Sequence, residues 1–243
     1  MDRLIYIAMT GAHQVMAQQA TTTHNLANLS TTGFRAQLDS FRAVPVQGPS
    51  LPTRAFVVDA TTGTDAAPGL IQETGRALDV ALTGPGWLVL QAADGSEVLT
   101  RNGNFNTNDS GVLVGQGGMA VAGDAGTVTV PADARVTIAP DGSISSLDAR
   151  GVVTALGRLR LLNPSQQEVE RGDDGLFRLV SGVTAQADGR VRVAAGRLEG
   201  SNVNAVDAMV RLISQARSFE LQMSLLKNAE SNEAKASQIV ALN

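Results

Sequence analysis

The chain has 243 residues, 25 glycines, eight prolines, no cysteine and a formal net charge of −4. The acidic balance argues against a nucleic-acid-binding protein, and the lack of cysteine excludes disulfides, thiolate metal sites and cysteine nucleophiles. Aromatic residues make up only 3% of the chain, which leaves few flat side chains on which bases or sugars could stack.

Glycine and proline are concentrated in the middle of the chain. Residues 1–43 contain only Gly11 and Gly33, residues 201–243 contain no glycine, and every proline lies between residues 45 and 164. Because both residue types break helices and form turns, this distribution predicts a mixed fold. We expect long N- and C-terminal α-helices that pack as a coiled-coil-like domain, with an inserted all-β domain that is barrel- or sandwich-like. The expected boundaries are a helix over 1–43, an extended linker over 44–75, a β-rich domain over 76–200 and a second helix over 201–243.

The N-terminal segment carries a stripe of residues at alternating spacings of three and four. The stripe consists of Ile5, Ala8, Ala12, Val15, Gln19, Thr22, Leu26 and Leu29. A period of 3.5 residues is typical of helices that pack as coiled coils. Gly33 is the expected stop signal, because a helix often ends at a glycine in the left-handed conformation.

A cleaved secretory signal peptide is the alternative interpretation of this end, since Arg3 precedes the apolar run over residues 4–9. The run is short, Asp2 precedes Arg3, and the stripe continues beyond any cleavage site. We therefore expect no cleaved signal peptide, so that the protein, if it is exported, is exported without one. No segment reaches the roughly 18–20 apolar residues of a transmembrane helix, so we expect no membrane span.

The middle of the chain reads as short strands separated by turns. Candidate strands cover 77–82, 87–91, 97–101, 112–114, 119–122, 127–130, 136–139, 152–162, 176–180 and 191–194. Tight-turn pairs lie between them, namely Asp94-Gly95, Asn102-Gly103, Asp141-Gly142, Asp174-Gly175 and Asp188-Gly189. Residues 44–67, before the first candidate strand, show little periodicity.

The C-terminal segment repeats the helical pattern. Its stripe consists of Leu212, Ala216, Phe219, Met223 and Leu226, thickened by Val206, Val210 and Ile213. Asn204 is the expected N-cap, and Asp207 lies three residues later, as the acidic residue of a capping box does.

The residues that usually carry catalysis are scattered. His13 and His24, the only histidines, are eleven residues apart in the first helix, which is not the i, i+4 spacing of a metal pair. Paired acids such as Asp173 and Asp174 lie in an expected turn. We expect no catalytic residue, no cofactor and no metal site, and hence a protein that is not an enzyme.

Several motifs resemble one family. The run from Asn25 to Asn28 with Thr32-Gly33-Phe34-Arg35 resembles the N-terminal signature of the axial proteins of the bacterial flagellum, which form its rod and hook. Residues 196–204 with Gln215, Arg217, Phe219 and Glu220 resemble the C-terminal signature of that family, and residues 78–82, 84–88 and 100–105 resemble its β-domain. Residues 1–12 and 222–230 are most similar to the proximal rod members.

This resemblance implies a structural component of the flagellar basal-body rod, a drive shaft that transmits motor torque toward the hook. It implies export through the flagellar type III apparatus, helical assembly in the periplasm through the terminal helices, and a role in motility. The implied partners are further copies, other proximal rod proteins, the distal rod protein, the export apparatus and the surrounding periplasmic ring, with no nucleic acid. A distal rod or hook paralogue, or an exported β-domain adhesin, remains an alternative.

The residues expected to pack in the assembly lie in both terminal segments and their signatures. They are Ile5, Ala12, Val15, Asn25, Leu26, Asn28, Leu29, Gly33, Phe34, Asn202, Asn204, Val206, Leu212, Phe219, Met223 and Leu226.

Overall fold

The computed structural model describes residues 2–45, 55–132, 134–148, 150–172 and 174–241. The chain divides into two compact units, each assembled from separate segments. The helical unit comprises Met1–Leu29, Ala36–Asp65 and Val203–Asn243, and the β unit comprises Ser30–Arg35 and Ala66–Asn202. The N-terminal helix, the C-terminal helix and the β-rich region between them are therefore confirmed.

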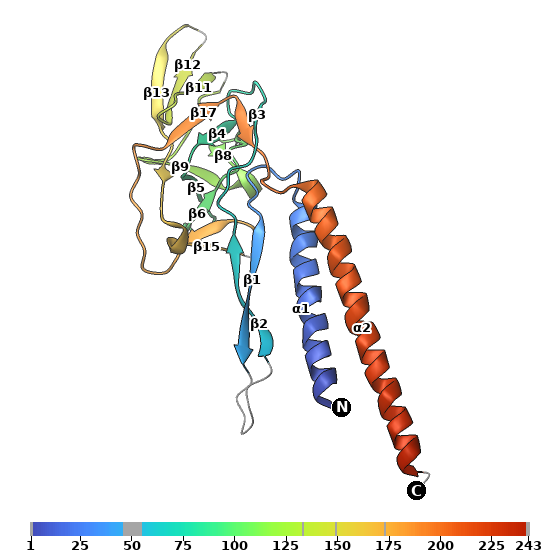
Figure 1. Ribbon diagram of the computed structural model, residues 1–243. Coiled ribbons are helices and arrows are strands. Elements are labelled where there is room, and N and C mark those ends of the chain that lie inside the picture. Colours follow the sequence, from blue (N-terminus) through green and yellow to red (C-terminus); the bar gives the residue numbers. More distant parts are fainter. Residues whose placement is uncertain (1, 46–54, 133, 149, 173, 242–243) are drawn as a thin grey trace. The chain divides into compact units, whose positions relative to one another are not determined.

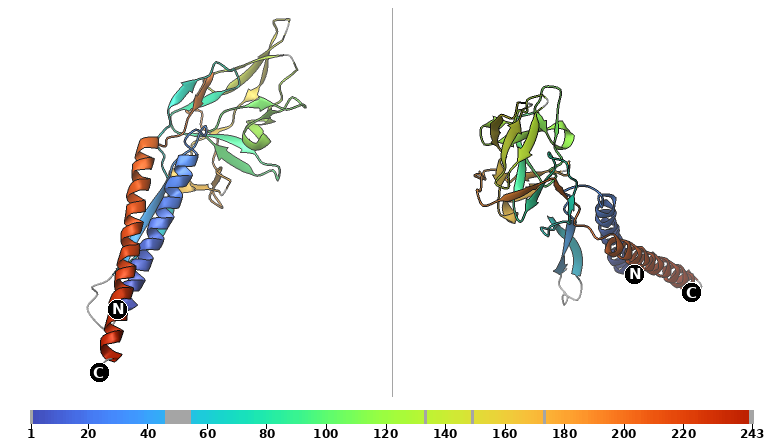
Figure 2. Two further views of the ribbon diagram at one scale, coloured as in Figure 1. Left: turned by 90° about the vertical axis from the view of Figure 1, so that its right-hand side faces the viewer. Right: turned by 90° about the horizontal axis from the view of Figure 1, so that it is seen from above.

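Two antiparallel helices form most of the helical unit. Helix α1 spans Asp2–Ala27 and helix α2 spans Ala205–Ala241. They lie side by side in each view, and the two chain ends lie at the same end of the pair (Figures 1 and 2). Contacts between the end of α1 and the start of α2 follow from this direction: the amide of Gln215 hydrogen-bonds to the hydroxyl of Thr22.

The expected helix over 1–43 is wrong beyond residue 27, because α1 ends at Ala27. The chain then turns through Gly33, whose φ of 70° is in the left-handed region, and continues as a strand, β1 (Gln37–Pro45). A lack of glycine and proline does not distinguish a helix from a strand, since the interiors of regular paired strands are also poor in both residues. Composition alone therefore predicted the helix too long.

The expected extended linker over 44–75 also differs from the structure. Strand β2 (Ala55–Thr64) pairs antiparallel with β1, from Gln37 opposite Thr64 to Pro45 opposite Ala55, with a register shift between Ser40 and Phe41. Strand β3 (Ile71–Glu73) pairs with β18 (Arg197–Glu199). The residues expected to form an arm instead supply two strands to β pairs, while residues 46–54 lie outside the described part of the chain.

The β unit contains one large antiparallel sheet and three smaller ones (Figure 1). The large sheet has the order β15 (Val169–Arg171), β16 (Phe177–Leu179), β6 (Glu97–Thr100), β5 (Trp87–Gln91), β9 (Ala120–Gly123), β8 (Leu113–Val114) and β7 (Asn106–Thr107), with β10 (Gly126–Thr127) paired to β9 and β14 (Leu161–Leu162) paired to β5. The smaller sheets are β11 (Arg135–Ile138), β12 (Ser143–Leu147) and β13 (Val153–Arg158), the pair β17 (Arg192–Ala195) and β4 (Val80–Thr83), and the pair β18 and β3. Two single-turn 3-10 helices are at Gln116–Gly118 and Gln166–Glu168.

The strands of the described residues do not close into a barrel, so the barrel alternative is wrong. Apolar side chains from strands and loops fill one main core, with Phe105 and Leu90 among those fully buried. A smaller second cluster combines Val89, Leu99, Leu162 and Phe177. Short strands that each bury alternate side chains explain why the sequence reads as apolar runs separated by turns.

Most expected strands and turns have counterparts in the structure. In four of the Asp-Gly turns, the aspartate Oδ1 accepts a hydrogen bond from the backbone N–H two residues later, at 2.9–3.1 Å. This bond closes the turn locally and explains why Asp-Gly predicts it. Within the expected β-rich domain, strands β7, β12, β15 and β18 had no counterpart among the candidates, because each is short or, in β12, rich in serine.

No helix among the described residues has the length and apolar character needed to cross a membrane.

Gly103 yields a test of this packing. A Cβ at Gly103 would lie 1.8 Å from the carbonyl oxygen of Val80, so the backbones of the two segments could not keep their approach. We expect Gly103→Ala to lower the free energy of unfolding of the β unit by on the order of 3 kcal/mol. Urea denaturation followed by the fluorescence of Trp87, the chain's only tryptophan, measures the loss.

Gly95→Ala is the matched control. Gly95 has a φ of 84° but open space around its Cβ position, so only backbone strain of about 1–2 kcal/mol is expected. Equal losses in the two variants would show that the close approach at Gly103 is not the constraint.

Candidate functional site

The side of α1 that meets α2 carries the predicted stripe. Ala8, Ala12 and Thr22 are buried. Ile5, Val15, Gln19 and Leu26 are half-buried, whereas Leu29, beyond the end of the helix, is exposed. Seven of the eight stripe positions of the first helix therefore lie on its covered side.

The covered side of α2 differs from the predicted stripe. Its buried and half-buried positions include a row at spacings of four and three residues, namely Ala208, Leu212, Gln215, Phe219, Gln222, Leu226 and Ala229. Ala216 and Met223, which were predicted in the stripe, are exposed, and two glutamines take their places. The prediction ranked positions by hydrophobicity, but the helical geometry places both glutamines on the covered side, and Gln215 also hydrogen-bonds to Thr22 of α1.

Asn25 joins α1 to the β1–β2 ribbon. Its side-chain N–H donates to the carbonyl of Gln37 at 2.9 Å, and its Oδ1 accepts from the N–H of Gln37 at 2.8 Å. Thr21 adds a hydrogen bond to the carboxylate of Asp39 at 2.9 Å. The side-chain N–H of Asn28 instead donates a local hydrogen bond, to the carbonyl of His24 in the last turn of α1. The first asparagine thus fixes where the ribbon begins, and the second closes the end of the helix.

Asn204 is the N-cap of α2, as predicted. Its Oδ1 accepts hydrogen bonds from the N–H groups of Val206 and Asp207 at 3.0 and 3.3 Å. The side chain of Asp207 forms an ion pair with Arg211 at 2.9 Å. The cap explains why the helix begins at Ala205.

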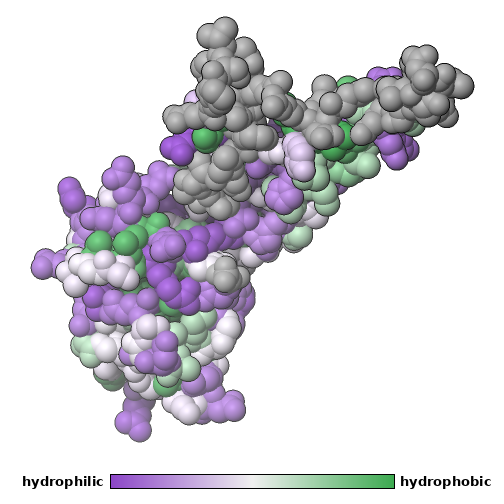
Figure 3. All heavy atoms as spheres, turned by 90° about the horizontal axis from the view of Figure 1, so that it is seen from below, coloured by the Kyte–Doolittle hydropathy of each residue, from purple (hydrophilic) through white to green (hydrophobic). Residues whose placement is uncertain are grey.

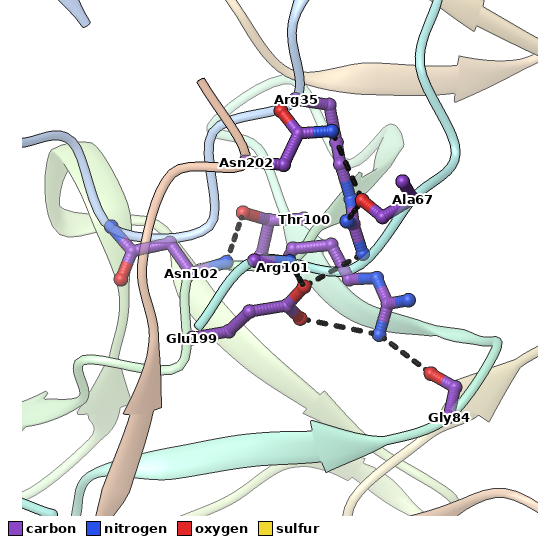
Figure 4. A network of polar contacts seen from close by, with 9 residues as sticks. Arg35, Ala67, Gly84, Thr100, Arg101, Asn102, Glu199 and Asn202 are labelled. Carbon is purple, nitrogen blue, oxygen red and sulfur yellow. Dashed lines mark hydrogen bonds and ion pairs between the residues drawn. The ribbon is translucent and has the colours of Figure 1, made fainter. Parts of the chain in front are cut away.

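The β unit holds a buried network of three charges (Figure 4). The carboxylate of Glu199 lies between two guanidinium groups, 2.7 Å from Nη2 of Arg35 and 3.4 Å from Nη1 of Arg101. The side chains of Arg35 and Glu199 are each 2% exposed, and that of Arg101 is 6% exposed. Glu199 also accepts a hydrogen bond from the N–H of Gly69 at 2.9 Å.

Backbone carbonyls complete the network. Arg101 donates to the carbonyl of Gly84 at 3.0 Å, and Arg35 donates to the carbonyl of Ala67. Asn202 donates to the same Ala67 carbonyl at 3.0 Å. The carbonyls provide acceptors for the positive charge that a single carboxylate leaves uncompensated between two arginines.

The pKa of Arg101 is lowered to about 10, mainly by burial and to a smaller extent by the nearby charge of Arg35, whereas the charge of Glu199 acts in the opposite direction. The guanidinium is still protonated at neutral pH. The shift shows that desolvation of Arg101 opposes folding and that the carboxylate of Glu199 offsets part of this cost.

Gly33 lies against the same network. Its N–H donates to the carbonyl of Glu199 at 2.7 Å, and a Cβ would lie 2.4 Å from the backbone carbon of Arg101. Gly33 therefore serves the turn and also permits close contact between two backbones. The N–H of Asn202 donates to the carbonyl of Phe34 at 3.3 Å, which aligns the two signature segments next to each other.

A row of aromatic and arginine side chains continues from Phe34. The guanidinium of Arg171 lies 4.7 Å from the centre of the Phe34 ring and 5.6 Å from that of Phe177, and its Nη1 donates to the carbonyl of Arg35. Phe177 contacts Trp87 at 4.5 Å between ring centres. The guanidinium of Arg101 lies 5.7 Å from the centre of the Trp87 ring. Arg101 therefore links this row of side chains to the charge network.

Sequence reasoning did not select Arg35, Arg101 or Glu199 as site residues. The three are separated by 66 and 98 residues, and single charges with no local pattern give no signal of a shared site. The available signal was that each falls within a quoted signature segment. The structure brings the Thr32–Arg35, Thr100–Phe105 and Gly196–Asn204 segments together at Glu199.

The comparisons with known proteins cover both ends and the β unit. Residues 5–35 match the family described as flagella basal body rod protein. Residues 81–146 match the flagellar hook protein FlgE/F/G D1 domain, and residues 194–239 match the flagellar basal body rod FlgEFG protein C-terminal family.

Curated relatives match the full chain. It is 49% identical to the flagellar basal-body rod protein FlgF of Escherichia coli over 252 aligned positions, which cover 100% of both chains. It is 48% identical, with the same coverage, to FlgF of Salmonella typhimurium. It is 29% identical to the flagellar basal-body rod protein FlgG of Agrobacterium fabrum, covering 94% of this chain and 95% of the relative.

Replacing the central carboxylate tests the charge network. Glu199→Gln keeps the shape of the side chain but leaves two buried guanidinium groups without a counter-charge. We expect the free energy of unfolding of the β unit to fall by about 3–5 kcal/mol, measured by urea denaturation with Trp87 fluorescence.

Glu97→Gln is the control, because Glu97 pairs with Arg160 at 2.7 Å but its side chain is 40% exposed. Its loss should stay below about 1 kcal/mol. A loss at Glu199 as small as that at Glu97 would contradict the central role of the buried carboxylate.

Proposed function

The chain belongs to the family of flagellar basal-body rod proteins and is a structural component of the rod, and we propose that it forms part of the proximal rod, joined to its neighbours through its terminal helices. In this role it transmits motor torque along the drive shaft toward the hook. The β unit adds lateral contacts outside the helices.

The exposed apolar face of α2 is the observation that carries this proposal. Val206, Met209, Val210 and Ile213 are 52–71% exposed, and none of them is among the covered positions of α2. Their spacing of three, one and three residues is the pattern by which a helix docks into an apolar groove or against another helix. Four large apolar side chains in two turns are unfavourable in water, so a neighbouring subunit that covers them gains stability.

Helix α1 supports the same role through its lack of charge. Residues 4–34 contain no Asp, Glu, Lys or Arg, although Tyr6, Met9 and Met16 are more than half exposed. A helix surface that stays in water normally carries charged side chains. Apolar and weakly polar residues cover much of the helix surface seen in Figure 3, whereas the β unit is mostly hydrophilic there.

The predicted packing residues divide among three tasks in this proposal. Ile5, Ala12, Val15, Leu26, Leu212, Phe219 and Leu226 hold the helix pair, and Asn25, Asn28, Gly33, Phe34, Asn202 and Asn204 shape the segments beside it. Leu29, Val206 and Met223 are exposed and contact neighbouring subunits. The outer contacts are heterologous and do not close into a ring, which produces a helical rod.

The remaining parts of the proposal follow from the family. The partners are further copies, the other proximal rod proteins, the distal rod protein, the type III export apparatus and the periplasmic ring. The chain reaches the periplasm without cleavage of a signal peptide. A non-enzymatic role agrees with the site, because its buried carboxylate, Glu199, is held between two arginines and not poised for proton transfer.

The alternatives are less well supported. The 29% identity to FlgG of Agrobacterium fabrum leaves a distal rod paralogue as an alternative, but the 49% identity to FlgF of Escherichia coli is higher. An adhesin would need exposed aromatic side chains, whereas Phe105 and Phe177 are buried and Trp87 is packed on Phe177.

Charging the outer face of α2 tests the proposal. Ile213→Glu should leave the monomer folded, since Ile213 is 57% exposed, but should abolish swimming in soft agar and the protein's recovery in purified basal bodies. The cause is the burial of an unpaired carboxylate in the subunit contact.

Ile213→Met, which keeps the position apolar, should retain swimming. The periplasmic amount of each variant separates failed export from failed assembly. If Ile213→Glu is exported normally and the cells swim normally, this face of α2 is not a subunit contact and the proposal is contradicted.

A further inference from the structure

We propose that Gln215 and Gln222 fix the register of the α1–α2 pair, and that Gly11 is the slot that admits Gln222. The inference concerns the isolated chain and stands apart from the proposed role in the rod. It rests on contacts within the helical unit.

The apolar part of the helix pair does not define one register. On α2 the covered positions alternate at spacings of four and three residues from Ala208 to Ala229, and on α1 they do so from Ile5 to Leu26. Small and branched apolar side chains recur along both stripes, so a slip of seven residues, about 10 Å, would again place apolar residues opposite one another. A seven-residue repeat by itself therefore permits several registers.

Gln215 makes the first specific contact. Its Nε2 donates to Oγ1 of Thr22 at 3.0 Å, and the same hydroxyl donates to the carbonyl of Gln18 at 2.8 Å. Thr22 is 8% exposed, so both of its hydrogen bonds are shielded from water. The Oε1 atom of Gln215 is buried without a hydrogen-bond partner in the described part of the chain, which leaves the contact with Thr22 as the compensation for its burial.

Gln222 makes the second contact through the space at Gly11. A Cβ at Gly11 would lie 3.2 Å from Cδ and from Nε2 of Gln222 and 3.3 Å from its Oε1. Gly11 is the only glycine in α1, and a glycine inside a helix costs about 1 kcal/mol relative to alanine. The space that it gives to the amide of Gln222 is a physical reason for a glycine at this position.

A slipped register keeps at most one of the two contacts. Because Gln215 and Gln222 are seven residues apart, a slip of seven residues brings Gln222 to Thr22 in one direction or Gln215 to Gly11 in the other, and the other glutamine loses its contact. Only the native register satisfies both glutamines, which opposes the shift. Buried polar residues in coiled coils set register in this way, at some cost in stability.

The chain's lack of cysteine makes a direct test practical. Gly11→Cys with Gln222→Cys reports the native register, and Gly11→Cys with Ala229→Cys reports a slip of seven residues. Each pair is made with Gln215 present and with Gln215→Leu, in the full purified chain. A short bismaleimide then cross-links the pairs, and the yields are compared.

Gln222 is tested in the same manner with a second set. Thr22→Cys with Gln215→Cys reports the native register, and Thr22→Cys with Ala208→Cys reports a slip in the other direction. These pairs are made with Gln222 present and with Gln222→Leu. Far-ultraviolet circular dichroism checks that each variant keeps its helices.

We expect native cross-links to dominate while the remaining glutamine is present, and the ratio of native to slipped yield to fall by about tenfold with leucine. Phe219→Leu, an apolar exchange on the same stripe, should leave the ratio unchanged. The proposal is overturned if leucine leaves the ratio unchanged in both sets, or if Phe219→Leu lowers it as much. Because the assay uses no rod, failure of assembly in cells would leave its outcome unaffected.

Discussion

The buried ion network around Glu199 is the interaction on which the rest of the structure depends. The chain passes between its two units four times, and the three β-unit segments that border these passages are residues 30–35, 66–69 and 199–202. All three meet at this carboxylate or at the Ala67 carbonyl beside it. One acidic side chain therefore contacts segments that are more than 160 residues apart in the sequence. Its removal leaves two buried positive charges, which is why so much depends on a single group.

Each of the two units is stabilised by different interactions within itself. The β unit buries a large apolar core and adds charge and aromatic contacts around Glu199 and Trp87. The helix pair instead has small or polar residues at several covered positions, such as Ala8, Thr22 and Gln215. Less apolar area is buried between such helices, and larger apolar side chains are left on the outside. This distribution suits helices whose outer faces are covered by neighbouring subunits.

The sequence predicted the parts of the fold that local chemistry controls. The two terminal helices, the Asn204 cap and most central strands and Asp-Gly turns follow from patterns within a few residues, and the structure contains them. The β1–β2 ribbon was not predicted, because the absence of turn residues is common to helices and strands. The seam of α2 was predicted one residue away at two positions, because hydrophobicity favoured Ala216 and Met223 over Gln215 and Gln222.

The sequence by itself determined a helix–β–helix chain, excluded cysteine chemistry, and identified a flagellar axial family through its signatures. Only the tertiary structure decided why those signatures contain Arg35, Arg101 and Glu199. An ion pair between distant segments has no periodicity or spacing that a sequence could display, since its energy depends on distance and burial in three dimensions. The same holds for Gly33, whose close contact with the backbone of Arg101 exists only once the chain has folded.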